Sequence, residues 1–176
     1  DAVNFGGIGL VIGHELTHGF DDQGRQFDPE GNLRDWWTAE DGKKFDERAS
    51  CVAKEYGNFV SIDDLKLNGK LTLGENTADN GGARIALAAL QATMSPEDAA
   101  KKIDGYTPEQ RYFLGFGRVW CMKQRPEIAR MLVTVDPHSP GKWRVDGVVQ
   151  NMSSFEQAWS CKAGDAMVSA NACRVW

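Results

Sequence analysis

The segment His14–His18, which reads HELTH, constrains this chain more than any other, because it holds two of the three histidines at a spacing of four. On a helix, residues i and i+4 lie on one face about one turn apart, so both imidazoles can point at one metal ion. Glu15 then lies beside that ion but is not required to bind it, which leaves its carboxylate free to accept a proton from water. The apolar residues before the motif favour a helix in the core.

A third metal ligand has to come from elsewhere, because a catalytic zinc site needs three protein ligands and one open position. A metzincin would need histidine at position 24, and this chain has Gly24 there, so that class is excluded. Glu75 and Asp79 instead offer two carboxylates four residues apart. One of them can bind the metal while the other orients a ligand. His14, His18 and Glu75 would then meet the ligand count.

The remaining candidates near the motif are Asp21 and Asp79, either of which can accept the second N–H of a metal-bound imidazole. Asp21 follows His18 by three residues. Each carboxylate taken alone is more simply explained as a solvated acid on a helix or turn. His138, taken alone, is more simply explained as an ordinary loop histidine. Placement around the two motif histidines favours the orienting role for the carboxylates.

Longer stretches accompany the histidine motif from the first residues to the last: NFGGIG at 4–9, VIGHELTHGFDDQGR at 11–25, DWW at 35–37, LGENTADNGG at 73–82, VDPHSPGKWR at 135–144 and CRVW at 173–176. In this order they resemble the neprilysin family of zinc metalloendopeptidases, and the resemblance covers essentially the whole chain. It implies a mainly α fold with a small β component, that of the C-terminal part of a thermolysin-like zincin (gluzincin) catalytic domain.

The resemblance also implies a role for each matching residue. The implied ligands of one zinc ion per chain are His14, His18 and Glu75, and the implied catalytic base is Glu15. Asp21 and Asp79 match the carboxylates that orient the histidines. His138 matches a histidine that stabilises the transition state, and Arg144 matches an arginine that binds a substrate carbonyl. The implied hydrophobic pocket for a substrate side chain consists of Leu10, Val11, Val119 and Trp120, for which plain core packing is the alternative.

The implied function is zinc-dependent hydrolysis of oligopeptides on the amino side of hydrophobic residues. The family carries an upstream helical domain and a substrate-binding strand, which are absent from these residues. A second hypothesis is therefore a fragment that binds zinc but is catalytically silent without that upstream region of the same parent protein. A third is that HELTH is structural and the protein is an interaction domain. Glu15 argues against the third, because a purely structural site needs no base.

Length and composition are those of one globular domain: 176 residues, of which 41% are apolar and 26% charged. The net charge of −5 and the lack of any Lys/Arg-rich run argue against nucleic acid as a partner. No apolar stretch approaches the roughly 20 residues that a membrane span needs. The chain starts at Asp1, close to the predicted catalytic helix and without an initiating methionine. We therefore expect a single catalytic-domain fragment, 1–176, from a longer protein.

Four cysteines, Cys51, Cys121, Cys161 and Cys173, allow three complete internal pairings, and the residues themselves do not choose between them. Free thiols in a cytosolic protein are the alternative. The resemblance implies a Cys51–Cys173 disulfide and upstream partners for the other two cysteines. Disulfide use would place the parent protein outside the cytosol, as an extracellular protein, a cell-surface ectodomain or a periplasmic protein.

Capping residues and apolar spacing predict helices at 5–20, 38–57, 76–93, 96–103, 108–123, 126–133 and 153–160. An Asn68-Gly69 pair inside the alternating segment 65–73 predicts a β-hairpin that leads the chain to Glu75. Gly81 and Gly82 favour close packing of the glutamate-bearing helix against the histidine-bearing one, because two helical glycines each cost about 1 kcal/mol relative to alanine. A local bend is the alternative.

Overall fold

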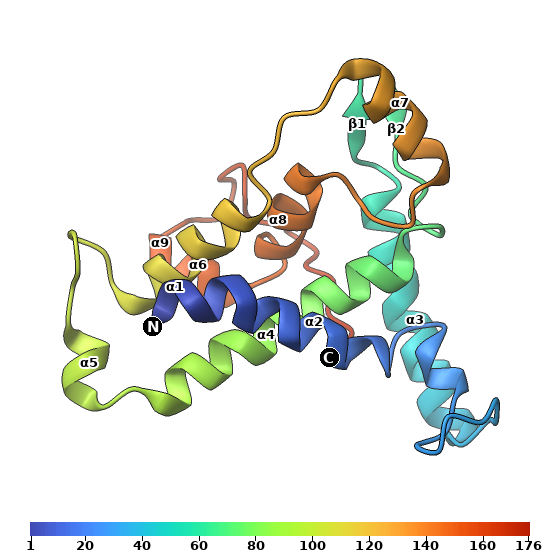
Figure 1. The fold of residues 1–176 in the computed structure, drawn as a ribbon, viewed down its shortest axis with the longest axis horizontal. Coiled ribbons are helices and arrows are strands. Elements are labelled where there is room, and N and C mark those ends of the chain that lie inside the picture. The colour runs from blue at the N-terminus through green and yellow to red at the C-terminus, as the bar shows by residue number, and fades with distance from the viewer.

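Two helices that pack along each other form the centre of the fold (Figure 1). The computed structural model describes all residues from 1 to 176. The first is a helical rod made of α1 (Ala2–Asn4), a π-helical segment (Phe5–Gly9) and α2 (Leu10–His18). The second is α4 (Leu73–Thr93), which is the longest helix of the chain. Because α2 carries the histidine motif and α4 begins just before Glu75, this pair positions the candidate site.

The other helices surround this pair, and the fold is mainly α, as predicted. They are α3 (Ala39–Tyr56), α5 (Pro96–Ala100), α6 (Pro108–Val119), α7 (Pro126–Val135), α8 (Gly141–Val149) and α9 (Ser153–Trp159), with a short 3-10 turn at Gly24–Gln26. The only sheet pairs β1 (Val60–Ile62) antiparallel to β2 (Leu65–Lys66), and it lies beside α7.

Capping explains why three helices start where the sequence predicted. The side chains of Thr38 and Ser95 each accept a hydrogen bond from a backbone N–H three residues later. Thr107 forms a full capping box with Gln110. The predicted ends were less accurate: the helices predicted at 96–103 and 108–123 stop at Ala100 and Val119. The helix predicted from 76 begins at Leu73, which places Glu75 in its first turn.

The predicted hairpin about Asn68 and Gly69 was wrong. The strands lie earlier in the chain, and the turn between them contains Asp63, whose φ is 53°. The side-chain oxygen of Asn68 instead accepts hydrogen bonds from the backbone N–H groups of Lys70 and Leu71, both at 3.1 Å. Asparagine therefore makes a local turn that leads into α4 rather than the centre of a hairpin.

Helix α8 was not predicted, because Pro140 and Gly141 open it and glycine also interrupts its interior at Gly147. The close approach of neighbours explains that interior glycine: a Cβ at Gly147 would lie 2.7 Å from the hydroxyl oxygen of the buried Tyr56. Helix α8 packs against α4, and this contact brings Arg144 to the candidate site.

Glycines allow α2 and α4 to approach closely, which confirms the packing interpretation of Gly81 and Gly82. A Cβ at Gly82 would lie 2.4 Å from the backbone nitrogen of His14, and one at Gly81 would lie 2.6 Å from Cγ2 of Thr17. On α2, a Cβ at Gly13 would lie 2.8 Å from the carbonyl oxygen of Gly82. This contact brings the helix backbones close enough for His14 to reach Asp79.

We expect Gly82→Ala to lower the free energy of unfolding by about 1–3 kcal/mol or more, because the added methyl group meets backbone that cannot move aside. It should also weaken metal binding, since the two helices that carry the ligands must separate. Gly117→Ala on α6 is the matched control, because no atom lies within 4 Å of its added Cβ. Urea unfolding of both variants checks the prediction, and equal stability would contradict it.

The hydrophobic core has two parts. The larger cluster contains residues of α2, α4, α6 and α8, including Leu10, Leu87, Tyr112, Phe116 and Val148. The smaller cluster packs α3 against the C-terminal segment, with Phe45, Val52, Tyr56, Cys173 and Val175. Helix α3 therefore buries one face, whereas α4 is buried on all sides from Asn76 to Ala83.

A disulfide joins Cys51 of α3 to Cys173 across 122 residues, as the resemblance implied. A covalent link across so long a loop typically contributes about 2–4 kcal/mol to stability, mainly by restricting the unfolded chain. Cys121 is exposed, Cys161 is half-buried, and the two are not paired with each other. Among the helices described, none is both long enough and apolar enough to cross a bilayer.

Candidate metal centre

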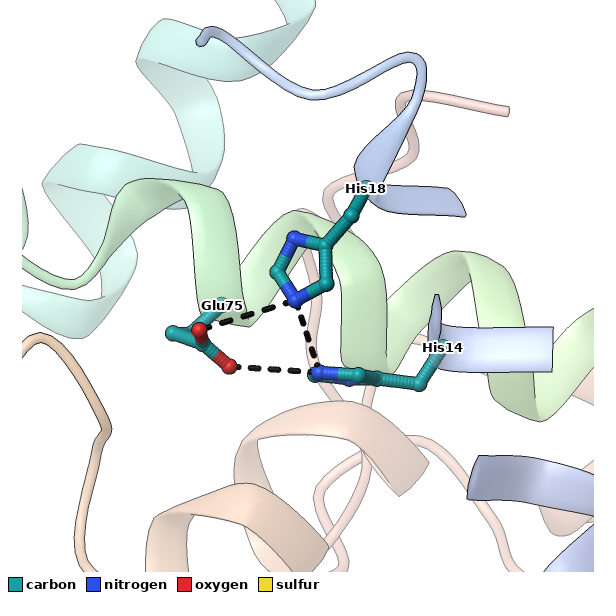
Figure 2. A group of neighbouring side chains, drawn as sticks. All are labelled: His14, His18 and Glu75. Atoms are coloured by element: carbon teal, nitrogen blue, oxygen red, sulfur yellow. Dashed lines mark hydrogen bonds and ion pairs between the residues drawn. The ribbon is translucent and has the colours of Figure 1, made fainter. Parts of the chain in front are cut away.

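Three side chains from α2 and α4 converge on one point (Figure 2). The Nε2 atoms of His14 and His18 lie 2.9 Å apart. The carboxylate of Glu75 faces both rings, with Oε2 at 3.2 Å from Nε2 of His14 and Oε1 at 3.5 Å from Nε2 of His18. The helical spacing of four directs the imidazoles to one side of α2, and the first turn of α4 directs the glutamate toward them. The structure therefore brings the three predicted ligands together.

This donor set fits a zinc ion. Tetrahedral zinc with bonds of about 2.0–2.1 Å holds its ligand atoms about 3.3 Å apart, which is close to the three separations above. Oε2 of Glu75 is buried and makes no well-aligned hydrogen bond, although Nε2 of His14 and of His138 lie 3.2 and 3.3 Å away. A buried carboxylate oxygen without a well-aligned donor is costly, and a cation at this point would satisfy it. Two imidazole nitrogens and one carboxylate are also the ligand types of a catalytic zinc site.

Each histidine is held from behind by a carboxylate. Oδ1 of Asp79 lies 2.8 Å from Nδ1 of His14, and Oδ2 of Asp21 lies 2.7 Å from Nδ1 of His18. The other oxygen of Asp21 accepts hydrogen bonds from the backbone N–H groups of Gln23 and Gly24, at 2.8 and 2.7 Å. A carboxylate at Nδ1 favours the tautomer that carries its proton there, so Nε2 keeps a lone pair for a metal.

Arg144 of α8 is bound to the same Asp79. Its Nε donates to Oδ2 of Asp79 and its Nη2 donates to Oδ1, both at 2.7 Å. Both residues are buried, and the guanidinium lies over the ring of Trp120, 3.9 Å from the ring centre. Burial lowers the pKa of Arg144. The hydrogen bonds and charge of Asp79 raise it by more, so the net shift of the Arg144 pKa is upward. Asp79 therefore connects His14 to a cation that remains charged.

His138 approaches Glu75 from the loop between α7 and α8. Its Nε2 lies 3.3 Å from Oε2 of Glu75, so all three histidines of the chain meet at this carboxylate. Oδ1 of Asp136 faces Nδ1 of His138 at 2.8 Å and accepts its backbone N–H at 2.9 Å. Although burial raises the pKa of Asp136, these hydrogen bonds lower it, and the net shift is downward. Sequence reasoning missed Asp136, for which the D-x-H spacing was the available signal.

Glu15 follows His14 on α2, and its side chain is exposed and makes no hydrogen bond within the chain. It is the only carboxylate of the HELTH motif, and no neighbouring group hydrogen-bonds it. A carboxylate next to a metal ligand, open to solvent and free of partners, can exchange protons with water.

The four residues of the expected hydrophobic pocket differ in their exposure, although Trp120 packs against the core cluster that contains Leu10. Leu10 is completely buried in the core, Val11 is half-buried, and Val119 is exposed at the end of α6. The ring of Trp120 lies against the guanidinium of Arg144. It lines a cavity of about 300 Å³ next to His138, together with the apolar residues Met122, Leu132 and Val133. The segment 120–144 therefore lines a cavity beside His138, while a second cavity is lined directly by His18 and Glu75.

In the candidate metal centre, the three imidazoles and the carboxylate of Glu75 lie close enough to shift one another's pKa values. Burial lowers the pKa of His14, but hydrogen bonds to Asp79 and Glu75 raise it more, to about 9. Burial raises the pKa of Glu75, but a hydrogen bond from His14 and the nearby charges of His138 and His18 lower it, and the net shift is downward. Without a metal ion, the site thus keeps Glu75 ionised and favours a second proton on His14; a metal ion would take the place of that proton on Nε2.

Two histidines one turn apart on a helix and a glutamate from a second helix form the zinc centre that defines the gluzincin class of metallopeptidases. A model of peptidase family M13 matches residues 1–175. The chain therefore belongs to peptidase family M13, the neprilysin family.

Individual relatives agree with this assignment. The chain is 46% identical to Neprilysin-1 of Caenorhabditis elegans, over 99% of its own length and 24% of that protein. It is 43% identical to endothelin-converting enzyme 1 of Bos taurus, over 100% and 24%. The crystal structure of the Mycobacterium tuberculosis zinc metalloprotease ZMP1 in complex with an inhibitor superimposes with a TM-score of 0.94 at 41% identity, over 99% of this chain and 27% of that one. The chain thus spans about a quarter of the length of these relatives.

Proposed function

We propose that this chain carries the catalytic centre of a zinc-dependent endopeptidase that hydrolyses oligopeptides. The observation that carries the proposal is the convergence of His14, His18 and Glu75, whose ligand atoms lie within 4.8 Å of one another. The carboxylates at Nδ1 of both histidines support it, as do the names of the relatives, which include neprilysin and endothelin-converting enzymes.

In this proposal His14, His18 and Glu75 hold one zinc ion. When bound, zinc supplies Lewis acidity, which makes water more acidic and polarises a carbonyl group. Glu15 accepts a proton from the attacking water and later returns it to the leaving amine. In this step His138 acts as an imidazolium: its Nδ1–H donates to Asp136, and its Nε2–H donates a hydrogen bond to the oxyanion that develops on the peptide carbonyl. Asp136 supports this step, because its carboxylate orients the ring of His138.

In the same proposal, Arg144 holds a substrate carbonyl in place. Two of its nitrogens are engaged by Asp79, and its Nη1 makes no hydrogen bond within the chain. Cleavage on the amino side of a hydrophobic residue requires an apolar pocket beside this arginine, and Trp120 supplies an apolar wall there. Cys51–Cys173 favours an oxidising compartment, so we propose an extracellular, cell-surface or periplasmic location.

An assay with an internally quenched oligopeptide tests the proposal, with the chain freed of metal by a chelator and then reloaded with zinc. We expect hydrolysis only after zinc is restored. A chain that binds zinc stoichiometrically but cleaves no peptide would favour the alternative, a catalytically silent module that requires further parts of a longer protein.

A separate prediction concerns the third ligand. Glu75→Gln should lower zinc affinity more than about 100-fold, because the site loses an anionic ligand, whereas Asp79→Asn should lower it only about 10- to 100-fold, because Asp79 acts through His14. Glu97→Gln on the exposed face of α5 is the control. Metal analysis after dialysis against a competing chelator measures all three. Full zinc occupancy in the Glu75 variant would show that another carboxylate is the ligand.

A further inference from the structure

A buried hydrogen bond joins the two segments that carry Glu75 and His138. Oγ of Ser139 donates to Oδ1 of Asn76 at 2.7 Å, and both residues are buried, with 3% and 0% of their surface exposed. Asn76 directly follows Glu75 on α4, and Ser139 directly follows His138 on the loop between α7 and α8. The bond therefore connects the immediate neighbours of a candidate ligand and of the candidate oxyanion donor.

Asn76 presents its oxygen to this loop because its other groups are already engaged. Its Nδ2 donates to Oγ1 of Thr72 at 2.9 Å, and that hydroxyl donates in turn to the carbonyl oxygen of Asn68 at 3.1 Å. The backbone carbonyl of Asn76 accepts a hydrogen bond from Nδ2 of Asn80 at 2.8 Å. The hydroxyl of Thr72 donates its only proton to Asn68, so it must accept a hydrogen bond from the amide nitrogen of Asn76. Oδ1 of Asn76 is therefore left as the acceptor for Ser139.

Few other contacts hold the His138 loop against α4. Asp136 orients the imidazole, but it lies on the same loop and moves with it. The imidazole is about half exposed, at 47% of its surface. The cavity of about 300 Å³ lies against the loop, so dense packing does not support it there. Apart from the contact of His138 with Glu75 itself, the next polar contact between this segment and α4 is the Arg144–Asp79 pair, on α8.

We infer that Ser139 is a positioning residue, whose hydrogen bond to Asn76 holds the imidazole of His138 at Glu75. Ser139 is buried, and its side chain hydrogen-bonds Asn76 rather than a ligand of the metal centre, so it acts through His138. Its effect on rate rests on the proposed function, whereas its effect on the position of His138 does not. A displacement of about 1 Å in a catalytic group can lower a rate by about 100-fold.

The histidine content of the chain makes the inference directly testable, because proton NMR of the zinc-loaded chain contains only three imidazole Hε1 signals. The His138 signal is assigned by its loss in His138→Ala. We expect Ser139→Ala to shift or broaden that signal and to leave those of His14 and His18 in place. Ser153→Ala, at an exposed serine, is the control and should change none of them.

Kinetics supply the second measurement. We expect Ser139→Ala to lower kcat about tenfold with little change in KM or zinc content, and to have no further effect in a chain that already carries His138→Ala. Ser139→Cys keeps the side-chain size with a weaker donor, so it should fall between serine and alanine, and it replaces the alanine variant if that one does not fold.

An unchanged His138 signal in the Ser139 variants would overturn the inference, and so would an equal loss of kcat in the presence and absence of the His138 side chain. If the wild-type chain hydrolyses no peptide, the proposed function fails by itself. The NMR comparison then still decides whether Ser139 positions His138.

Discussion

Glu15→Gln is expected to abolish measurable peptide hydrolysis while the chain keeps its zinc. Proton transfer by a positioned carboxylate typically contributes about 10²- to 10⁴-fold to a rate, and the amide of glutamine cannot accept the proton. The substitution changes no contact in the structure, because the Glu15 side chain is exposed and makes no hydrogen bond within the chain. Stability and metal content should therefore stay at the wild-type level, and only kcat should fall.

The measurement is the steady-state rate on a quenched oligopeptide, with zinc content determined on the same samples. Glu97→Gln provides a control of identical chemistry at an exposed glutamate of α5, away from the metal centre. Equal rates for wild type and Glu15→Gln would exclude Glu15 as the base. A Glu15 variant that loses its zinc would instead indicate that this carboxylate helps to bind the metal.

The metal centre could be predicted largely from the sequence because its information is local. The spacing of His14 and His18 determines that both face one side of a helix, and Glu75 and Asp79 likewise share a helix. The choice of Glu75 over Asp79 as ligand came from the family resemblance. The structure is consistent with it, since Glu75 faces both Nε2 atoms whereas Asp79 lies at Nδ1 of His14.

Contacts between distant segments could not be predicted in this way. The Arg144–Asp79 pair spans 65 residues and the Ser139–Asn76 bond spans 63, and no spacing rule connects such positions. The error at Asn68 has a different cause, because an Asn-Gly pair suits a hairpin but an asparagine oxygen can equally accept its own chain's N–H groups. The packing of α3 against Gly69 distinguishes the hairpin from the local turn. A Cβ added at Gly69 would lie 2.0 Å from the carbonyl oxygen of Ala53.

Asp79→Ala is expected to lower the free energy of unfolding by about 3–5 kcal/mol and zinc affinity about 10- to 100-fold. Asp79 has no exposed surface and is the only carboxylate that hydrogen-bonds the guanidinium of Arg144. Its removal leaves a buried cation without its hydrogen-bonded anion and leaves Nδ1 of His14 without an acceptor. Stability should fall because of the first loss, and metal affinity because of the second.

A double-mutant cycle separates these two effects. When Arg144 is also replaced, in Asp79→Ala/Arg144→Met, no buried charge remains unpaired, so much of the stability should return, because an apolar pair can replace a buried ion pair at little cost. Zinc affinity should stay low in the double variant, since His14 still lacks its acceptor. Urea unfolding and zinc titration of the four proteins measure both quantities. Strictly additive losses of stability would contradict the ion pair, and restored zinc affinity would contradict the orienting role of Asp79.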